Sequence, residues 1–248
     1  MTNHNPETSP QVYARIGGVA YLIIIVAGAL GEMFVRNSII VSGDAAATYN
    51  NIVAHPLLWR LGIVGDLIMH VCDVILMVVF YVLLKPVNKN LALAALLFNL
   101  IQTAVLVANK MNLLMPLFLS GDADYLKAFE PQQLQALAYL SVKAHGYGFG
   151  IGLIFFGFTC LVLGYLIFKS GYLPKVLGVL MQIAGLCYLI NSFALILAPA
   201  FADKLFPAIL LPPFIGELSL CLWLLIKGVN VPKWNERVSM RPTGGVYI

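Results

Sequence analysis

Charged residues are scarce in this sequence. Only 10% of its 248 residues are Asp, Glu, Lys or Arg, whereas 60% are hydrophobic. A soluble domain carries about 25% charged residues, so water cannot surround this chain on all sides. The shortage of charge therefore excludes an ordinary soluble domain and favours a membrane protein.

Several motifs that would name a chemistry are also absent. The sequence has no P-loop, GxGxxG, GxSxG, HExxH or haem-attachment pattern. It has no CxxC pair either, and its four cysteines (Cys72, Cys160, Cys187 and Cys221) fall in different apolar runs. We interpret them as buried free thiols rather than a redox pair. The first twelve residues are polar and the first apolar run shows no cleavage pattern, so we expect no cleavable signal peptide.

Long apolar runs dominate what is present, and six are long enough to cross about 30 Å of hydrocarbon. They lie near residues 13–35, 57–84, 90–118, 136–168, 173–199 and 206–228. The sequence predicts an all-α polytopic protein whose six transmembrane helices form one bundle. We assign residues 1–11 to an N-terminal tail, 12–228 to the membrane domain and 229–248 to a C-terminal tail.

The distribution of basic residues predicts the orientation. The larger set falls at one side: Arg15, Lys85, Lys89, Lys169, Lys175, Lys227, Lys233, Arg237 and Arg241. The smaller set, at the other side, is Arg36, Arg60, Lys127 and Lys204. The positive-inside rule then places both tails in the cytoplasm. The net charge of +4 is explained by topology, so we expect no nucleic-acid partner, only membrane lipids and a small ligand or ion.

Local signals predict several details of the loops and of the packing. Asp44 and Asp122 are natural N-caps for short helices at the outer surface. Gly171 suits a helix C-terminus and Pro174 the first turn of the next helix, so the fourth and fifth spans should be antiparallel neighbours. The fourth span has glycines at 150, 157 and 164, and the fifth at 171, 178 and 185. Such spacing predicts close backbone approach between helices in lipid.

The sixth span contains Pro212 and Pro213. A double proline removes hydrogen-bond donors, so we expect it to kink or unwind that helix. A broken helix in a membrane either lines a cavity or improves packing, and the sequence leaves both possibilities open.

The second span carries Asp66, His70 and Asp73. At 100° per residue these three share an arc of roughly 60° on one helix face. Charges inside a bilayer are costly unless they are paired, neutralised or hydrated, so such a cluster indicates a functional site.

Polar residues on other spans lie at similar depth and predict a shared pocket that opens to the exterior. Lys110, His145 and Glu217 are its expected wall residues, with Glu32 near the outer end of the first span. His145 should face inward and Lys143 outward to the interface. On the third span, Asn99, Gln102 and Thr103 share a face with Lys110.

The predicted pocket holds an excess of acid, because Glu32, Asp66, Asp73 and Glu217 face one firmly internal base, Lys110. Such an excess cannot persist in a low dielectric unless protons, charged histidines or a bound cation neutralise it. The sequence alone leaves these options open.

A divalent metal is one possible cofactor. The candidate ligands are Asp66, His70, Asp73, His145 and Glu217, a mixed N/O set. Our leading hypothesis is an intramembrane pocket that binds a small ligand or ion. The alternatives are a metal-dependent hydrolase of lipid-like substrates, a transporter, and a non-catalytic structural component; the oligomeric state is not predicted.

A series of short motifs resembles a known family. They include Ala14–Gly18, Ser42–Ala45, Trp59–Gly62, Phe155–Gly157, Ser170–Gly178 and Gly216–Leu218. Their order resembles the bacterial membrane proteins grouped as domain-of-unknown-function family 4386, over about residues 12–228. The resemblance implies a six-helix protein of the bacterial inner membrane, and it implies no activity and no site residue.

Overall fold

The computed structural model of the chain describes residues 9–240, and every regular element in that range is a helix. The elements are α1 (Pro10–Leu30), η1 (Gly31–Arg36), α2 (Asn37–Ile39), α3 (Ala45–Ala54), α4 (Pro56–Leu84), α5 (Lys89–Asn109), α6 (Met111–Leu119), η2 (Asp124–Ala128), α7 (Pro131–Ser170), α8 (Lys175–Leu197), α9 (Pro199–Leu205), η3 (Ala208–Leu210), α10 (Leu211–Ile226) and α11 (Val231–Ser239). Of the predicted tails, 1–11 and 229–248, the parts at 1–8 and 241–248 lie outside the described residues. The described part of the C-terminal tail includes the helix α11.

Six helical segments are long and apolar enough to span a membrane, which confirms the predicted fold class. They are Pro10–Ile39, Pro56–Leu84, Lys89–Leu119, Pro131–Ser170, Lys175–Leu197 and Ala208–Ile226. Large apolar side chains such as Leu57 and Val71 are exposed on their outer faces. A surface of this kind is stable only when another apolar phase, here lipid, covers it.

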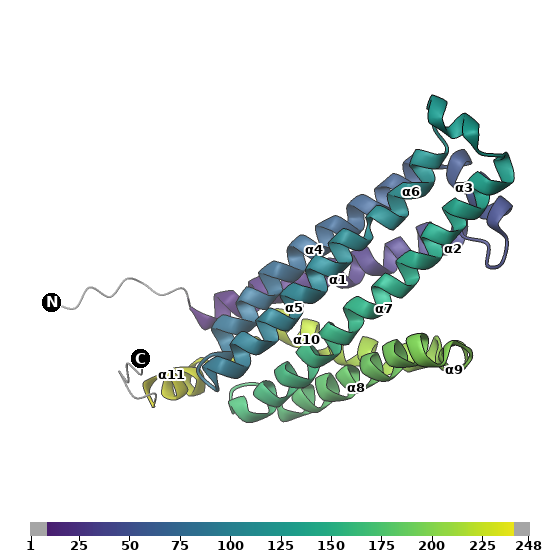
Figure 1. Cartoon of the computed structure of the whole chain (residues 1–248). Coiled ribbons are helices and arrows are strands. Elements are labelled where there is room, and N and C mark those ends of the chain that lie inside the picture. Colours follow the sequence, from purple (N-terminus) through teal and green to yellow (C-terminus); the bar gives the residue numbers. More distant parts are fainter. Residues whose placement is uncertain (1–8, 241–248) are drawn as a thin grey trace, which may run out of the picture.

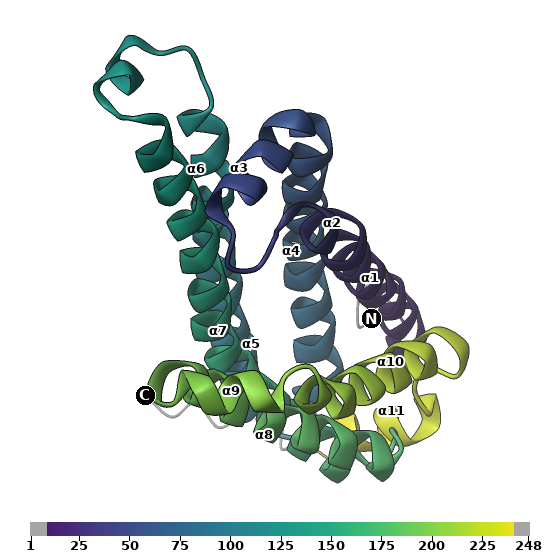
Figure 2. The ribbon, with the colours of Figure 1, turned by 90° about the vertical axis from the view of Figure 1, so that its right-hand side faces the viewer.

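The spans form a closed ring in which each one packs mainly on two neighbours. Around the ring, α1 packs on α4, α4 on α5, α5 on α7, α7 on α8, α8 on α10 and α10 on α1. Figures 1 and 2 show α4, α5 and α7 running along the bundle while α8 crosses them obliquely. The inward faces of the six spans therefore surround a common axis.

The two ends of the bundle differ. We call the end where α1 begins and α10 finishes the tail end, and the end that carries α3 and η2 the loop end (Figure 1). At the tail end, the Gln11 side chain donates from Nε2 to the Lys227 carbonyl oxygen at 3.0 Å. Trp234 of α11 donates from Nε1 to the Leu83 carbonyl oxygen at 3.1 Å. Both described ends of the chain therefore lie at the same end of the bundle, as an even number of spans requires.

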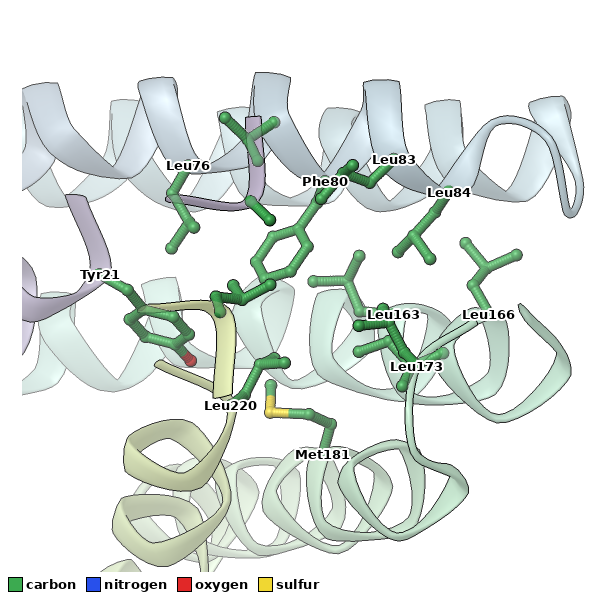
Figure 3. Packing of buried hydrophobic residues seen from close by; sticks show 14 of the residues in the cluster. Tyr21, Leu76, Phe80, Leu83, Leu84, Leu163, Leu166, Leu173, Met181 and Leu220 are labelled. Carbon is green, nitrogen blue, oxygen red and sulfur yellow. The ribbon is translucent and has the colours of Figure 1, made fainter. Parts of the chain in front are cut away.

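Apolar packing fills the tail half of the ring. Figure 3 shows Phe80 of α4 between Tyr21 of α1 and Leu163 of α7, with Met181 and Leu220 beneath. Most of these side chains are less than 5% exposed. This cluster holds the neighbouring spans together in the tail half of the ring.

A second, smaller apolar cluster closes the loop end. Trp59, which is 1% exposed, donates from Nε1 to the Leu113 carbonyl oxygen at 2.7 Å and packs with Ile39 and Ile52. The helix α3 lies over this cluster. Asp44 caps that helix as predicted, because its Oδ1 accepts from Ala47 N at 2.8 Å.

The predicted close approach of the fourth and fifth spans is confirmed. A Cβ built on Gly164 would lie 2.6 Å from the Gly178 carbonyl oxygen, and one on Gly185 would lie 2.7 Å from the Gly157 carbonyl oxygen. Gly171, with φ of 78°, ends α7 in the left-handed conformation, also as predicted.

Two local predictions are wrong. Asp122 does not cap the helix in the second outer loop, since η2 begins at Asp124 after Ala123 with no side-chain cap. Pro212 and Pro213 do not interrupt α10, because they lie in its first turn, where their missing N–H groups cost no intrahelical hydrogen bond. The change of helix geometry comes just before them, between η3 and α10.

Candidate functional site

Three ionisable residues of α4 face the interior, whereas Arg60, near the start of that helix, is exposed. Asp66, His70 and Asp73 are 1%, 2% and 7% exposed. Seven residues separate the two carboxylates, which places them about 10 Å apart along the helix axis. The structure divides the polar residues of the spans into two groups, one around each carboxylate.

The first group, which we call the loop-side cluster, consists of Glu32, Arg36, Asp66, Lys110 and His145. Asp66 Oδ2 accepts from Lys110 Nζ at 2.7 Å and from Arg36 Nη1 at 2.9 Å. Arg36 Nε in turn donates to Glu32 Oε2 at 2.6 Å. Two cations thus face two carboxylates, and the cluster carries no net charge when all four are ionised.

Both cations of this cluster come from places where a span departs from regular α-helix. Arg36 ends the π-helical segment η1, and Lys110 is the junction residue between α5 and α6. Gly31 begins η1, and a Cβ there would lie 3.1 Å from an Arg36 nitrogen and 3.2 Å from Asp66 Oδ1. These irregularities are typical of functional positions in helices, and here they direct two cations at one carboxylate.

The two histidines lie beside these charges. His145 of α7 is 8% exposed, and its Nε2 lies 3.4 Å from Lys110 Nζ. It faces inward and Lys143 is exposed, as predicted. His70 lies between Asp66 and Asp73 on α4, and its Nε2 has no protein hydrogen-bond partner.

The second group, the central cluster, consists of Asp73, Asn99, Thr103, Glu217, Tyr21 and Tyr188. Asp73 Oδ2 accepts from Thr103 Oγ1 at 2.6 Å and from Asn99 Nδ2 at 3.1 Å. Glu217 accepts from the Tyr21 hydroxyl at 3.0 Å and from the Tyr188 hydroxyl. All of these donors are neutral, so no salt bridge reaches either carboxylate.

Asp73 and Glu217 line the same cavity, which has a volume of about 30 Å³. The remaining lining residues are Tyr21, Ile24, Leu76, Met77, Phe80, Phe156, Leu163 and Met181, several of which are visible in Figure 3. The lining residues, with Asp73 and Glu217 included, come from α1, α4, α7, α8 and α10, so the cavity lies on the axis of the ring. None of them is a cation.

The candidate residues predicted from the sequence thus fall into two sites. Asp66, Lys110 and His145 belong to the loop-side cluster, Asp73 and Glu217 line the cavity, and His70 lies between the two. Within residues 9–240, no three His, Cys, Asp or Glu side chains are close enough together to hold a metal ion. The five proposed metal ligands therefore do not form one coordination sphere in this arrangement.

The sequence did not predict Arg36 as a residue of the site. Arg36 follows the first apolar run, so it was counted only among the basic residues of the outer side. The available signal was its spacing from Glu32, since Glu and Arg at i, i+4 face the same side of a helix.

The ring of six spans and its two buried polar clusters define a class, the polytopic helical membrane protein with ionisable residues in its interior. The chain belongs to the family described as domain of unknown function DUF4386, whose model matches residues 16–228. A relative from Archaeoglobus fulgidus, described as an uncharacterized protein, is 31% identical over 166 residues, which are 67% of this chain and 83% of that protein. No solved structure matches the chain.

Proposed function

We propose that this protein binds a small monovalent cation, the proton included, between Asp73 and Glu217 in the centre of the membrane. Binding would serve movement of that cation across the membrane, alone or coupled to a solute. We place the protein in a bacterial cytoplasmic membrane because its motifs resemble those of bacterial membrane proteins, and we place both tails in the cytoplasm because of its basic-residue distribution.

One observation carries the proposal, namely that the central cavity is lined by two carboxylates and by no cation. Two carboxylates facing one low-dielectric space cannot both remain ionised without compensation. The loop-side cluster cannot supply it, because its cations already pair with Asp66 and Glu32. The charge must therefore be balanced within the cavity itself.

The size of the cavity limits what can enter. A water molecule needs a cavity of about 10–15 Å³, so the cavity of about 30 Å³ holds about two water molecules or a cation of similar size. This volume suits a proton carried by water or a largely dehydrated small cation, and it is too small for an organic solute in this conformation.

The first test measures the unfolding temperature of the purified protein in sodium chloride and in choline chloride at equal ionic strength. A bound ion stabilises the folded protein by about 2.7 kcal/mol at a hundredfold excess over its Kd. We expect sodium to raise the unfolding temperature of the wild-type protein, and Glu217→Gln and Asp73→Asn to remove this effect. Asp124→Asn is the matched control, because the Asp124 side chain is 92% exposed and far from the ring axis on η2.

The second test addresses the proton. Infrared spectroscopy detects the carbonyl stretch of a protonated carboxylic acid, which an ionised carboxylate lacks. If a proton occupies the cavity, the wild-type protein and Asp124→Asn should both show this band, and Glu217→Gln should lose its main component. The proposal is contradicted if sodium has no effect on unfolding and Glu217→Gln removes no carboxylic acid band.

A further inference from the structure

The seam between α4 and α5 holds most of the buried polar atoms that lack a protein partner. In residues 9–240 these atoms are Asp66 Oδ1, His70 Nε2, Asn99 Oδ1, Gln102 Oε1 and Ser192 Oγ. The first four belong to α4 or α5, and only Ser192 lies elsewhere, on α8. These five residues are 0% to 6% exposed. Asp66 Oδ1 faces the first span, 3.2 Å from a Cβ built on Gly31, and the other three atoms of α4 and α5 define the seam.

Hydrogen bonds across the seam show that it runs from the loop end toward the centre of the bundle. Asp66 pairs with Lys110 toward the loop end, and Asp73 pairs with Thr103 and Asn99 toward the centre. His70 lies between these two crossings on the same face of α4. The polar surface is therefore continuous from the loop-side cluster to the cavity.

We propose that this seam binds a file of water molecules, and that the cation of the central cavity enters and leaves along it from the loop end. A buried polar atom with no partner costs about 1–3 kcal/mol, and proteins meet this cost with bound water where several such atoms lie together. Three such atoms along one pair of helices, His70 Nε2, Asn99 Oδ1 and Gln102 Oε1, define a hydrated path rather than an isolated site. The part concerning the cation depends on the function proposed above, whereas the hydration of the seam does not.

The loop-side cluster stands at the entrance of this path. The charged groups that act on His70 are Asp66 on its own helix and Lys110 at the α5–α6 junction, and His70 in turn faces His145 of α7. Beyond them, the crevice beside Arg36 and Trp59 has no volume for a water molecule. The entrance on this side is therefore closed to water in this conformation.

The test uses cysteines introduced into the seam. His70→Cys and Gln102→Cys are made in a Cys72→Ala background and exposed to silver ions, which are monovalent cations that bind thiolates. Val71→Cys is the matched control, since Val71 is 63% exposed on the lipid-facing side of the same helix. Reacted cysteines are counted by mass spectrometry after maleimide labelling of the unfolded protein.

A thiol forms its reactive thiolate in water and not in hydrocarbon, so we expect both seam cysteines to react at least about tenfold faster than Val71→Cys. Equal rates at all three positions overturn the proposal. Should the seam variants fail to fold, an experimental structure of the unmodified chain decides, because density for water must lie within hydrogen-bond distance of His70 Nε2 and Asn99 Oδ1.

The two proposals can fail separately. A sodium effect that depends on Glu217, together with unreactive seam cysteines, refutes the route and leaves the binding site. Reactive seam cysteines without any sodium or proton signal refute the binding site and leave a hydrated seam.

Discussion

The loop-side and central clusters stabilise buried carboxylates in two different ways. In the loop-side cluster, Asp66 accepts hydrogen bonds from two cations, and Arg36 extends the network to Glu32. In the central cluster, Asp73 and Glu217 accept hydrogen bonds from an amide and three hydroxyl groups, with no cation among them. One cluster is neutral by internal pairing, whereas the other, in the function that we propose, is neutralised by a cation that enters its cavity.

This difference separates residues that stabilise the fold from residues that can gain or lose a bound cation. A buried ion pair is strongly destabilised when one partner is removed, because the other charge remains in a low dielectric. A carboxylate with neutral donors can gain or lose a cation while its hydrogen bonds persist. We therefore expect structural effects from mutations in the loop-side cluster and functional effects from mutations around the cavity.

The largest expected effect is that of Lys110→Met. The change removes one of the two cations on Asp66, whose side chain is 1% exposed, so we expect a loss of about 3–5 kcal/mol in the free energy of unfolding. Unfolding in mixed micelles measures it. Lys143→Met is the control, because Lys143 is exposed on α7 and should cost no more than about 0.5 kcal/mol. Similar losses for the two lysines would remove the distinction between the clusters.

A double variant sharpens this result. Lys110→Met leaves two carboxylates, Asp66 and Glu32, on one cation, and adding Asp66→Asn removes this excess negative charge while Arg36 keeps Glu32 as its partner at 2.6 Å. We expect the double variant to be more stable than the sum of the single losses predicts, with a coupling energy of about 1–3 kcal/mol. A double-mutant cycle on unfolding free energies measures this coupling, and simple additivity would contradict a direct pair.

A smaller effect is expected for Tyr188→Phe. The change removes one hydrogen bond to Glu217, so we expect a loss of about 0.5–1.5 kcal/mol, the usual range when both partners are neutral. Tyr147→Phe serves as the control, because Tyr147 is 45% exposed on α7. A loss of about 1.5–3 kcal/mol would instead show that Glu217 is ionised, and would contradict the proposal if sodium had no effect on unfolding.

The smallest effect is expected for Glu32→Gln. The Glu32 side chain is 54% exposed, and exposed ion pairs contribute only about 0.2–1 kcal/mol. We expect a change in unfolding free energy near the lower end of that range, decreasing further in high salt. A loss as large as that of Lys110→Met would place Glu32 at the centre of the cluster rather than at its edge.

The features that the sequence predicts well depend on local chemistry. Six apolar runs predict six spans, Asp44 predicts a helix start, and the glycines of α7 and α8 predict their contact. Each of these follows from length, capping or side-chain size within a short segment. The expected orientation of the tails stays a prediction, since the fold fixes only that both described ends lie together.

The arrangement of the site depends on contacts between distant segments, which helical periodicity does not specify. Asp66 and Asp73 share a helix face, so they were expected in one pocket, yet seven residues of helix separate them into different clusters. Arg36 was missed because η1 extends the first span beyond its apolar run and turns Arg36 inward. The residues that a carboxylate contacts on neighbouring helices thus determine whether it is paired with cations, as Asp66 is, or with neutral donors, as Asp73 is.

The glycine contacts between α7 and α8 limit how this ring can move. The backbones of Gly164 and Gly178 lie in direct contact, and so do those of Gly157 and Gly185, so at these points no side chain separates the two helices. The α7–α8 pair is then the stiffest contact of the ring. An opening of the ring is left to α1, α4, α5 and α10, and the π-helical segment and the junction at Lys110 provide two points at which a span can bend.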